Sequence, residues 1–241
     1  MAVGALRQLF DRLYQEQERA WSPERWGRKP SARAQEAWEY MITPWPPLTR
    51  KDFEHWFPVS PGELHIDFSQ RRKVLYLPPL EKNGEFVPVL SMKCNLNETQ
   101  SEMKLRVMLI QRVRDCDEND GERLRGIGFR LASPHGDEEE HEDAEGDEEK
   151  PEGRHDFYHA QLIRDFDGGP SVECPDWLPC TQPSFPLTAD CPVTLVLCLL
   201  LTLYGKRCTW DLVSRNTGLF NLLKPYLKDK LQPWIKWEAL A

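Results

Sequence analysis

The sequence lacks the short motifs that mark common catalytic and cofactor sites. It contains no P-loop, no G-x-G-x-x-G after a strand pattern, no G-x-S-x-G turn, no H-E-x-x-H helix and no zinc-finger spacing. Its seven cysteines include no C-x-x-C pair, and such an odd set predicts reduced, packed thiols. These absences favour a non-catalytic protein, and we expect neither a cofactor nor a metal.

We expect no secretory leader in this sequence, because charged residues interrupt the apolar N-terminal segment at Arg7, Asp11 and Arg12. We therefore expect a cytoplasmic protein that has no membrane partner. Its net charge is −8, yet ten carboxylates lie between Asp137 and Glu149, and subtracting their −10 leaves +2 for the remainder. A nearly neutral body gives no general electrostatic reason to bind nucleic acid.

The longest apolar stretch runs from Asp190 to Gly205 and is apolar on every side. It reads as a helix, because Pro192 falls in the first turn, Asp190 can cap the free amides and Gly205 can supply a left-handed exit. The stretch is shorter than the roughly 20 apolar residues that cross a bilayer. We therefore predict a central core helix within a C-terminal helical layer, residues 190–241, with a membrane anchor as the alternative.

The N-terminal part predicts a pair of helices over residues 1–42. The first has one apolar face, made by Leu6, Leu9, Phe10, Leu13 and Tyr14, and the second begins near Ser31. A connector rich in Pro and Trp follows over residues 43–62, with a short helix expected from Thr49 to Trp56.

Alternating apolar residues predict an antiparallel sheet over residues 63–167. The expected strands are residues 64–68, 74–77, 86–92, 103–113, 124–132 and 155–166, with a tight turn at Asn83-Gly84. Residues 135–153 are predicted to be a disordered acidic loop, and residues 168–189 a second Pro-rich connector. The fold class is thus α+β: a single domain over residues 1–241, with an antiparallel β-meander of about five to seven strands flanked by an N-terminal helical pair and a C-terminal helical layer.

The strand around residues 155–166 carries the one local cluster of side chains suited to catalysis or metal binding. His155, His159 and Gln161 fall on one face of an ideal strand. Imidazoles at such positions can bind a metal or transfer protons. However, His155 and His159 would lie about 13 Å apart, which is too far to share one ion. We interpret the strand as structural, and keep a nucleic-acid-associated or hydrolytic enzyme as the alternative function.

A possible basic stripe includes Lys104, Arg106 and the arginines between Arg123 and Arg130. If these side chains share the solvent face beside Tyr76 or Phe129, they can follow a phosphate backbone. Cations on strand faces also serve solubility and edge protection, and the neutral body favours that interpretation.

The C-terminal tail holds Trp234, Ile235 and Trp237, which can bury several hundred Å² at ~25 cal/mol per Å². These residues are our candidates for binding another protein or a second copy of the chain, and packing on their own domain is the equal alternative. The predicted function is a cytosolic, non-catalytic interaction or regulatory subunit that binds another protein through aromatic-rich surfaces.

Overall fold

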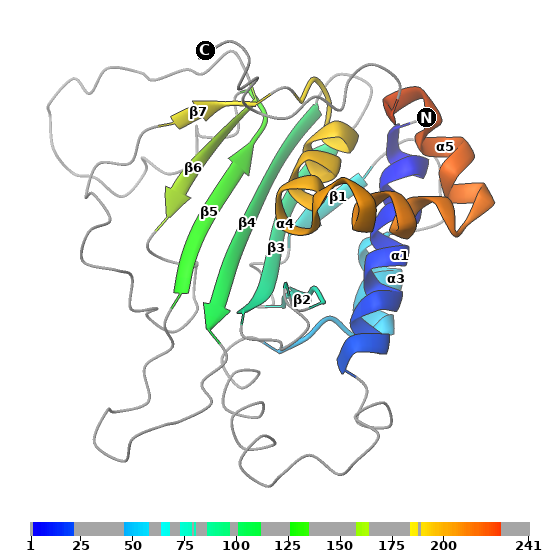
Figure 1. Ribbon diagram of the computed structural model, residues 1–241, viewed down its shortest axis with the longest axis horizontal. Coiled ribbons are helices and arrows are strands. Elements are labelled where there is room, and N and C mark those ends of the chain that lie inside the picture. Colours follow the sequence, from blue (N-terminus) through cyan, green and yellow to red (C-terminus); the bar gives the residue numbers. More distant parts are fainter. Residues whose placement is uncertain are drawn as a thin grey trace, which may run out of the picture.

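The computed structural model has an α+β fold, which confirms the predicted class (Figure 1). The residues it describes are 2–21, 46–57, 64–67, 73–78, 80, 86–96, 101–111, 126–134, 158–163, 184–187 and 189–227. Within them lie four helices and seven strands, namely α1 (Ala2–Trp21), α3 (Arg50–Trp56), α4 (Pro192–Ser214), α5 (Thr217–Leu227), β1 (Leu64–Asp67), β2 (Leu75–Tyr76), β3 (Phe86–Leu96), β4 (Ser101–Gln111), β5 (Gly126–Ala132), β6 (His159–Ile163) and β7 (Ser184–Pro186). The second predicted helix, the Asn83-Gly84 turn, the acidic loop and the C-terminal tail lie outside the described residues.

All the strands belong to one antiparallel sheet in the order β1-β3-β4-β5-β6-β7, and β2 also pairs with β3. From β3 to β7 each strand pairs with the next one along the chain, as a meander requires. The strands β3 and β4 pair over their whole length, from Phe86 opposite Gln111 to Leu96 opposite Ser101.

The strand β7 was not predicted, because it lies inside the second Pro-rich connector. It pairs with β6, with Phe185 opposite Ala160, and forms the end of the sheet order. Proline is tolerated on an edge strand, where one side of the backbone needs no ladder partner. The prolines that argued for a connector are therefore compatible with a short edge strand.

The helices pack on one face of the sheet (Figure 1). That face carries alternate residues of the central strands, including Leu90 and Met92 of β3 and Leu105 and Val107 of β4, all at most 2% exposed. In α1 the predicted apolar side is buried as expected, and its Phe10 ring lies 5.5 Å from the Phe57 ring just beyond α3. The helical layer is thus built on the sheet from both ends of the chain.

The predicted short helix is confirmed as α3, and its start follows from a capping box. The Thr49 hydroxyl accepts from the Asp52 backbone N–H at 3.2 Å, while the Asp52 carboxylate accepts from the Thr49 backbone N–H at 3.0 Å. Each side chain satisfies an amide that the first turn leaves free. This pair of hydrogen bonds fixes where α3 begins, and therefore where the side chain of Arg50, its first residue, extends from the helix.

The central helix α4 is confirmed as a core element, since every residue from Pro192 to Leu200 is buried. Its N-cap is Cys191 rather than the predicted Asp190. The reason is Thr194, whose hydroxyl accepts from the backbone N–H groups of both Asp190 and Cys191 at 3.0 Å. Among the described helices, α4 is the one long and apolar enough to cross a membrane. The core helix of a soluble protein has the same length and composition, and half of the most apolar 18-residue stretch of α4 is buried.

Replacing Gly205 by alanine is expected to lower the free energy of unfolding by about 1–3 kcal/mol. Gly205 has the predicted positive φ (φ 71°, ψ 172°), but the chain kinks there and continues as helix instead of ending. An added Cβ would meet nothing within 4 Å, so the cost is backbone strain alone.

Urea denaturation measures this effect, and Gly4→Ala in α1 is the matched control, because its Cβ also meets nothing within 4 Å and its φ is not positive. The control is expected to raise the free energy of unfolding by about 0.5–1 kcal/mol. Stabilisation by both substitutions would contradict the strained conformation of Gly205.

Candidate functional site

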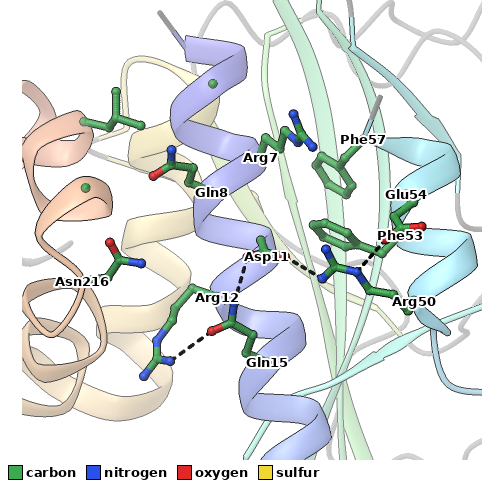
Figure 2. Close-up of a pocket in the computed structure, with 13 residues that line it drawn as sticks. Arg7, Gln8, Asp11, Arg12, Gln15, Arg50, Phe53, Glu54, Phe57 and Asn216 are labelled. Carbon is green, nitrogen blue, oxygen red and sulfur yellow. Dashed lines mark hydrogen bonds and ion pairs between the residues drawn. The ribbon is translucent and has the colours of Figure 1, made fainter. Parts of the chain in front are cut away.

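The outward face of α1 forms the floor of a groove between α3 and α5 (Figure 2). The opposite face of α1 is apolar and buried, so the residues of its polar face are left to line this space. We call it the helix groove; its volume is about 530 Å³ and its lining residues are Gly4, Arg7, Gln8, Asp11, Arg12, Gln15, Arg50, Phe53, Glu54, Phe57, Asn216, Gly218 and Leu222.

On the α3 side of the groove, the Arg50 guanidinium is held by two carboxylates. Its Nη1 donates to Asp11 Oδ1 at 2.8 Å and its Nε to Glu54 Oε1 at 3.0 Å, and the hydrogen bonds to Glu54 and then Asp11 raise the pKa of Arg50. The guanidinium carbon also lies 5.4 Å from the centre of the Phe53 ring. Half-exposed ion pairs contribute little stability, but several constraints together fix the direction of this side chain.

On the α5 side, a chain of hydrogen bonds connects the polar residues of α1. Gln15 Nε2 donates to Asp11 Oδ2 at 2.9 Å, and Arg12 Nη2 lies 2.6 Å from Glu16 Oε1. Arg12 is only 7% exposed, although its sequence position predicts the solvent side. Its Nε is buried and has no hydrogen-bond partner among the described residues.

The start of α5 forms the wall on this side. The Asn216 side-chain oxygen accepts from the Leu219 backbone N–H at 3.0 Å, which caps the helix. Gly218 follows, and a Cβ placed there would lie 3.9 Å from Gln8 Oε1, so the Gln8 side chain reaches the first turn of α5.

Most hydrogen-bond acceptors of the side chains that line the groove already accept a hydrogen bond, whereas several of the hydrogen-bond donors make none within the described residues. Both Asp11 oxygens and the side-chain oxygens of Gln15 and Asn216 accept hydrogen bonds, Gln15 from Arg12 at 3.4 Å. By contrast, Arg7 makes no hydrogen bond or ion pair within the described part of the chain. The lining includes three arginines, of which Arg12 is paired with Glu16 and Arg50 with Asp11 and Glu54, so Arg7 is the lining arginine without an ion pair among the described residues. A ligand rich in acceptors and carrying negative charge complements this set.

The predicted histidine cluster is only partly covered by the structure. His159 and Gln161 lie on β6 and share a face, as expected, but His159 is 1% exposed. Gln161 accepts a hydrogen bond from Arg130 of the neighbouring strand. The described residues hold no group of three or more His, Cys, Asp or Glu side chains arranged for a metal. His155 and the tail residues Trp234, Ile235 and Trp237 lie outside the described residues.

The predicted basic stripe is correct in register for Lys104, Arg106 and Arg130, but Arg130 is buried; Arg123 and Arg125 lie outside the described residues. Pairing of β4 with β5 places Arg106 opposite Arg130, and Lys104 lies two residues away on the same face. However, Arg130 is only 8% exposed, because a long arginine side chain can lie along the sheet and bond to Gln161. Tyr76 is fully buried, and Phe129 points to the other face, so neither offers the expected stacking surface.

The Cys94 thiol is not suited to act as a nucleophile. Burial raises the pKa of its thiol to about 12, so the reactive thiolate is scarce at neutral pH.

The helix groove was not predicted as a site, because its three parts are far apart in the sequence. The only signal was the polar face of α1, which reads equally well as an ordinary solvated face. No family model, curated protein or solved structure matches this chain.

Proposed function

We propose that this chain is a cytosolic, non-catalytic interaction subunit, and that its helix groove binds an extended acidic segment of a partner protein. The observation that carries the proposal is that most acceptors of the groove are engaged, whereas Arg7 makes no hydrogen bond or ion pair with any residue that the structure describes. A carboxylate supplies two oxygens that match the two parallel N–H groups of a guanidinium.

The shape of the groove supports a peptide segment as the ligand. It is lined mainly by polar side chains, whereas small-molecule sites are mostly apolar. Gly4 on the α1 floor and Gly218 on the α5 wall present no side chains, so a peptide backbone can approach closely there. The amide groups of Gln8 and Asn216 can bond to peptide N–H and C=O groups.

Selection from a phage library of random eight-residue peptides, using the full chain as bait, tests the proposal. We expect enrichment of Asp and Glu in the selected peptides. A synthetic copy of the best peptide is expected to lose at least about tenfold in affinity when Arg7 is changed to Glu, which corresponds to about 1.4 kcal/mol. Fluorescence anisotropy measures the affinity, and unchanged thermal melting shows that Arg7→Glu is folded.

The matched control is Arg207→Glu, because Arg207 is an exposed arginine of α4 outside the groove. This control is expected to leave the affinity within about twofold, since only distant charge changes. Selected peptides without acidic residues, or equal losses in both variants, would overturn the proposal. A large gain in affinity after replacing residues 137–149 by a Gly/Ser linker would identify the chain's own carboxylates as the occupant and would also overturn it.

A further inference from the structure

We infer that the helix groove binds a carboxylate at Arg7 and discriminates against a phosphoryl group there, so that the partner segment is recognised in its unphosphorylated form. This inference rests on the proposed function and specifies the chemistry of the anion that the groove accepts. It follows from how the other charges of the groove are already neutralised.

Arg7 is the lining arginine whose full set of donors is available within the described part of the chain. Arg50, by contrast, donates to Asp11 and to Glu54. A carboxylate has two oxygens, and the two parallel N–H groups on one edge of a guanidinium satisfy both of them. A single carboxylate therefore binds Arg7 without displacing either ion pair of Arg50.

The charges next to Arg7 are negative overall. Asp11 lies four residues after Arg7, and side chains at this spacing are neighbours on one face of a helix. One arginine, Arg50, is paired with two carboxylates, so Asp11, Glu54 and Arg50 together carry a charge of −1. Figure 2 shows that Arg7 extends toward Phe57, whose ring carries no hydrogen-bond donor for an anion.

A phosphoryl group does not match these surroundings. It carries a charge of about −1.5 to −2 at pH 7 and three acceptor oxygens. Its attraction to one arginine rises in proportion to its charge, whereas the cost of removing an ion from water rises with the square of the charge. Clusters of unpaired arginines offset this cost, while carboxylates beside a phosphoryl group add repulsion. The described residues of the groove supply one unpaired arginine beside a net charge of −1.

Synthetic peptides based on the best selected sequence test this discrimination. A double-mutant cycle with Arg7→Gln first identifies the acidic peptide residue that contacts Arg7. That position then carries either glutamate or phosphoserine, and fluorescence anisotropy measures the affinity of the unmodified chain for each peptide. We expect the glutamate peptide to bind at least about fivefold more tightly. A smaller difference, or tighter binding of the phosphoserine peptide, would overturn the inference.

Removing the two carboxylates tests whether charge is the cause. Asp11→Asn combined with Glu54→Gln keeps side-chain oxygens that accept from Arg50, but changes the charge of this cluster from −1 to +1. We expect the phosphoserine peptide to gain at least about fivefold in affinity relative to the glutamate peptide. Because both ion pairs are exposed, the variant should fold normally, and thermal melting checks this.

The matched control is Asp211→Asn, which removes a carboxylate from the exposed part of α4 outside the groove. It should leave the ratio of the two affinities within about twofold. An unchanged ratio in the folded Asp11→Asn/Glu54→Gln variant would show that these carboxylates do not exclude the phosphoryl group, and the inference would be wrong.

The proposed function fails on a different result, namely that Arg7→Glu binds the glutamate peptide as tightly as the unmodified chain does. A preference for phosphoserine, together with a loss of affinity in Arg7→Glu, would overturn the inference alone and leave the proposed function supported.

Discussion

Replacing Leu197 by aspartate is expected to leave little folded protein. Leu197 is fully buried in the middle of the buried stretch of α4, on the helix that packs against the sheet. Removing a buried leucine side chain costs about 2–5 kcal/mol, and burying an unpaired carboxylate adds several more. Their sum approaches the 5–15 kcal/mol or so that stabilises a typical domain.

Soluble yield and a thermal melt followed by circular dichroism measure this effect. Lys206→Asp, on the exposed part of the same helix, is the control and is expected to shift the free energy of unfolding by less than about 0.5 kcal/mol. A Leu197→Asp protein with unchanged yield and melting would contradict a core position. Wild-type protein recovered with membranes, and released from them by this substitution, would favour the membrane-anchor alternative instead.

Local pattern predicted most of the secondary structure, because periodicity and burial agree in these elements. The apolar face of α1 repeats at helical spacing, and β4 alternates from Met103 to Val107, so each has a face that must be buried. The position of α4 followed from its uniform apolarity, and a short helix from Thr49 to Trp56 was expected within the aromatic-rich connector. In each of these elements the deciding signal lies within about twenty residues of sequence.

The predictions failed at features that are determined by contacts between elements far apart in the sequence. The sequence of Ser184–Pro186 is compatible with a connector or an edge strand, and only the presence of β6 beside it selects the strand. The pattern at Gly205 predicts a left-handed residue, but packing against α5 and α1 allows the helix to resume after it. Arg130 was expected on the correct face of the sheet, yet its exposure depends on the neighbouring Gln161.

The helix groove shows the same limit. Its polar residues on α1 were recognised as the solvated side of an amphipathic helix. Arg50 and Asn216 enter the site only because α3 and α5 pack on either side of α1. Local periodicity distinguishes a polar face from an apolar one, but it does not distinguish a face open to water from one flanked by two walls.

One polar residue breaks the apolar face of α1, and its position gives the second large expected effect. Gln17 lies four residues after Leu13, which is a core-facing spacing, and it is only 6% exposed. Its Nε2 donates to the Leu48 carbonyl at 2.9 Å and its Oε1 accepts from the Tyr76 backbone N–H at 2.8 Å. One side chain thus ties α1 to β2 and to the segment before α3.

Replacing Gln17 by leucine is expected to lower the free energy of unfolding by about 2–6 kcal/mol, because two buried backbone groups lose their partner and each such loss costs about 1–3 kcal/mol. Urea denaturation measures the change, and Gln8→Leu is the matched control, since Gln8 is exposed and makes no hydrogen bond within the described structure. Gln17→Glu should also destabilise, because glutamate can still accept from Tyr76 but cannot donate to Leu48 when ionised. The loss in this variant should shrink at low pH, where the protonated carboxyl regains a donor. A gain in stability for Gln17→Leu would mean that apolar packing at this position outweighs both hydrogen bonds, and that Gln17 does not join these elements.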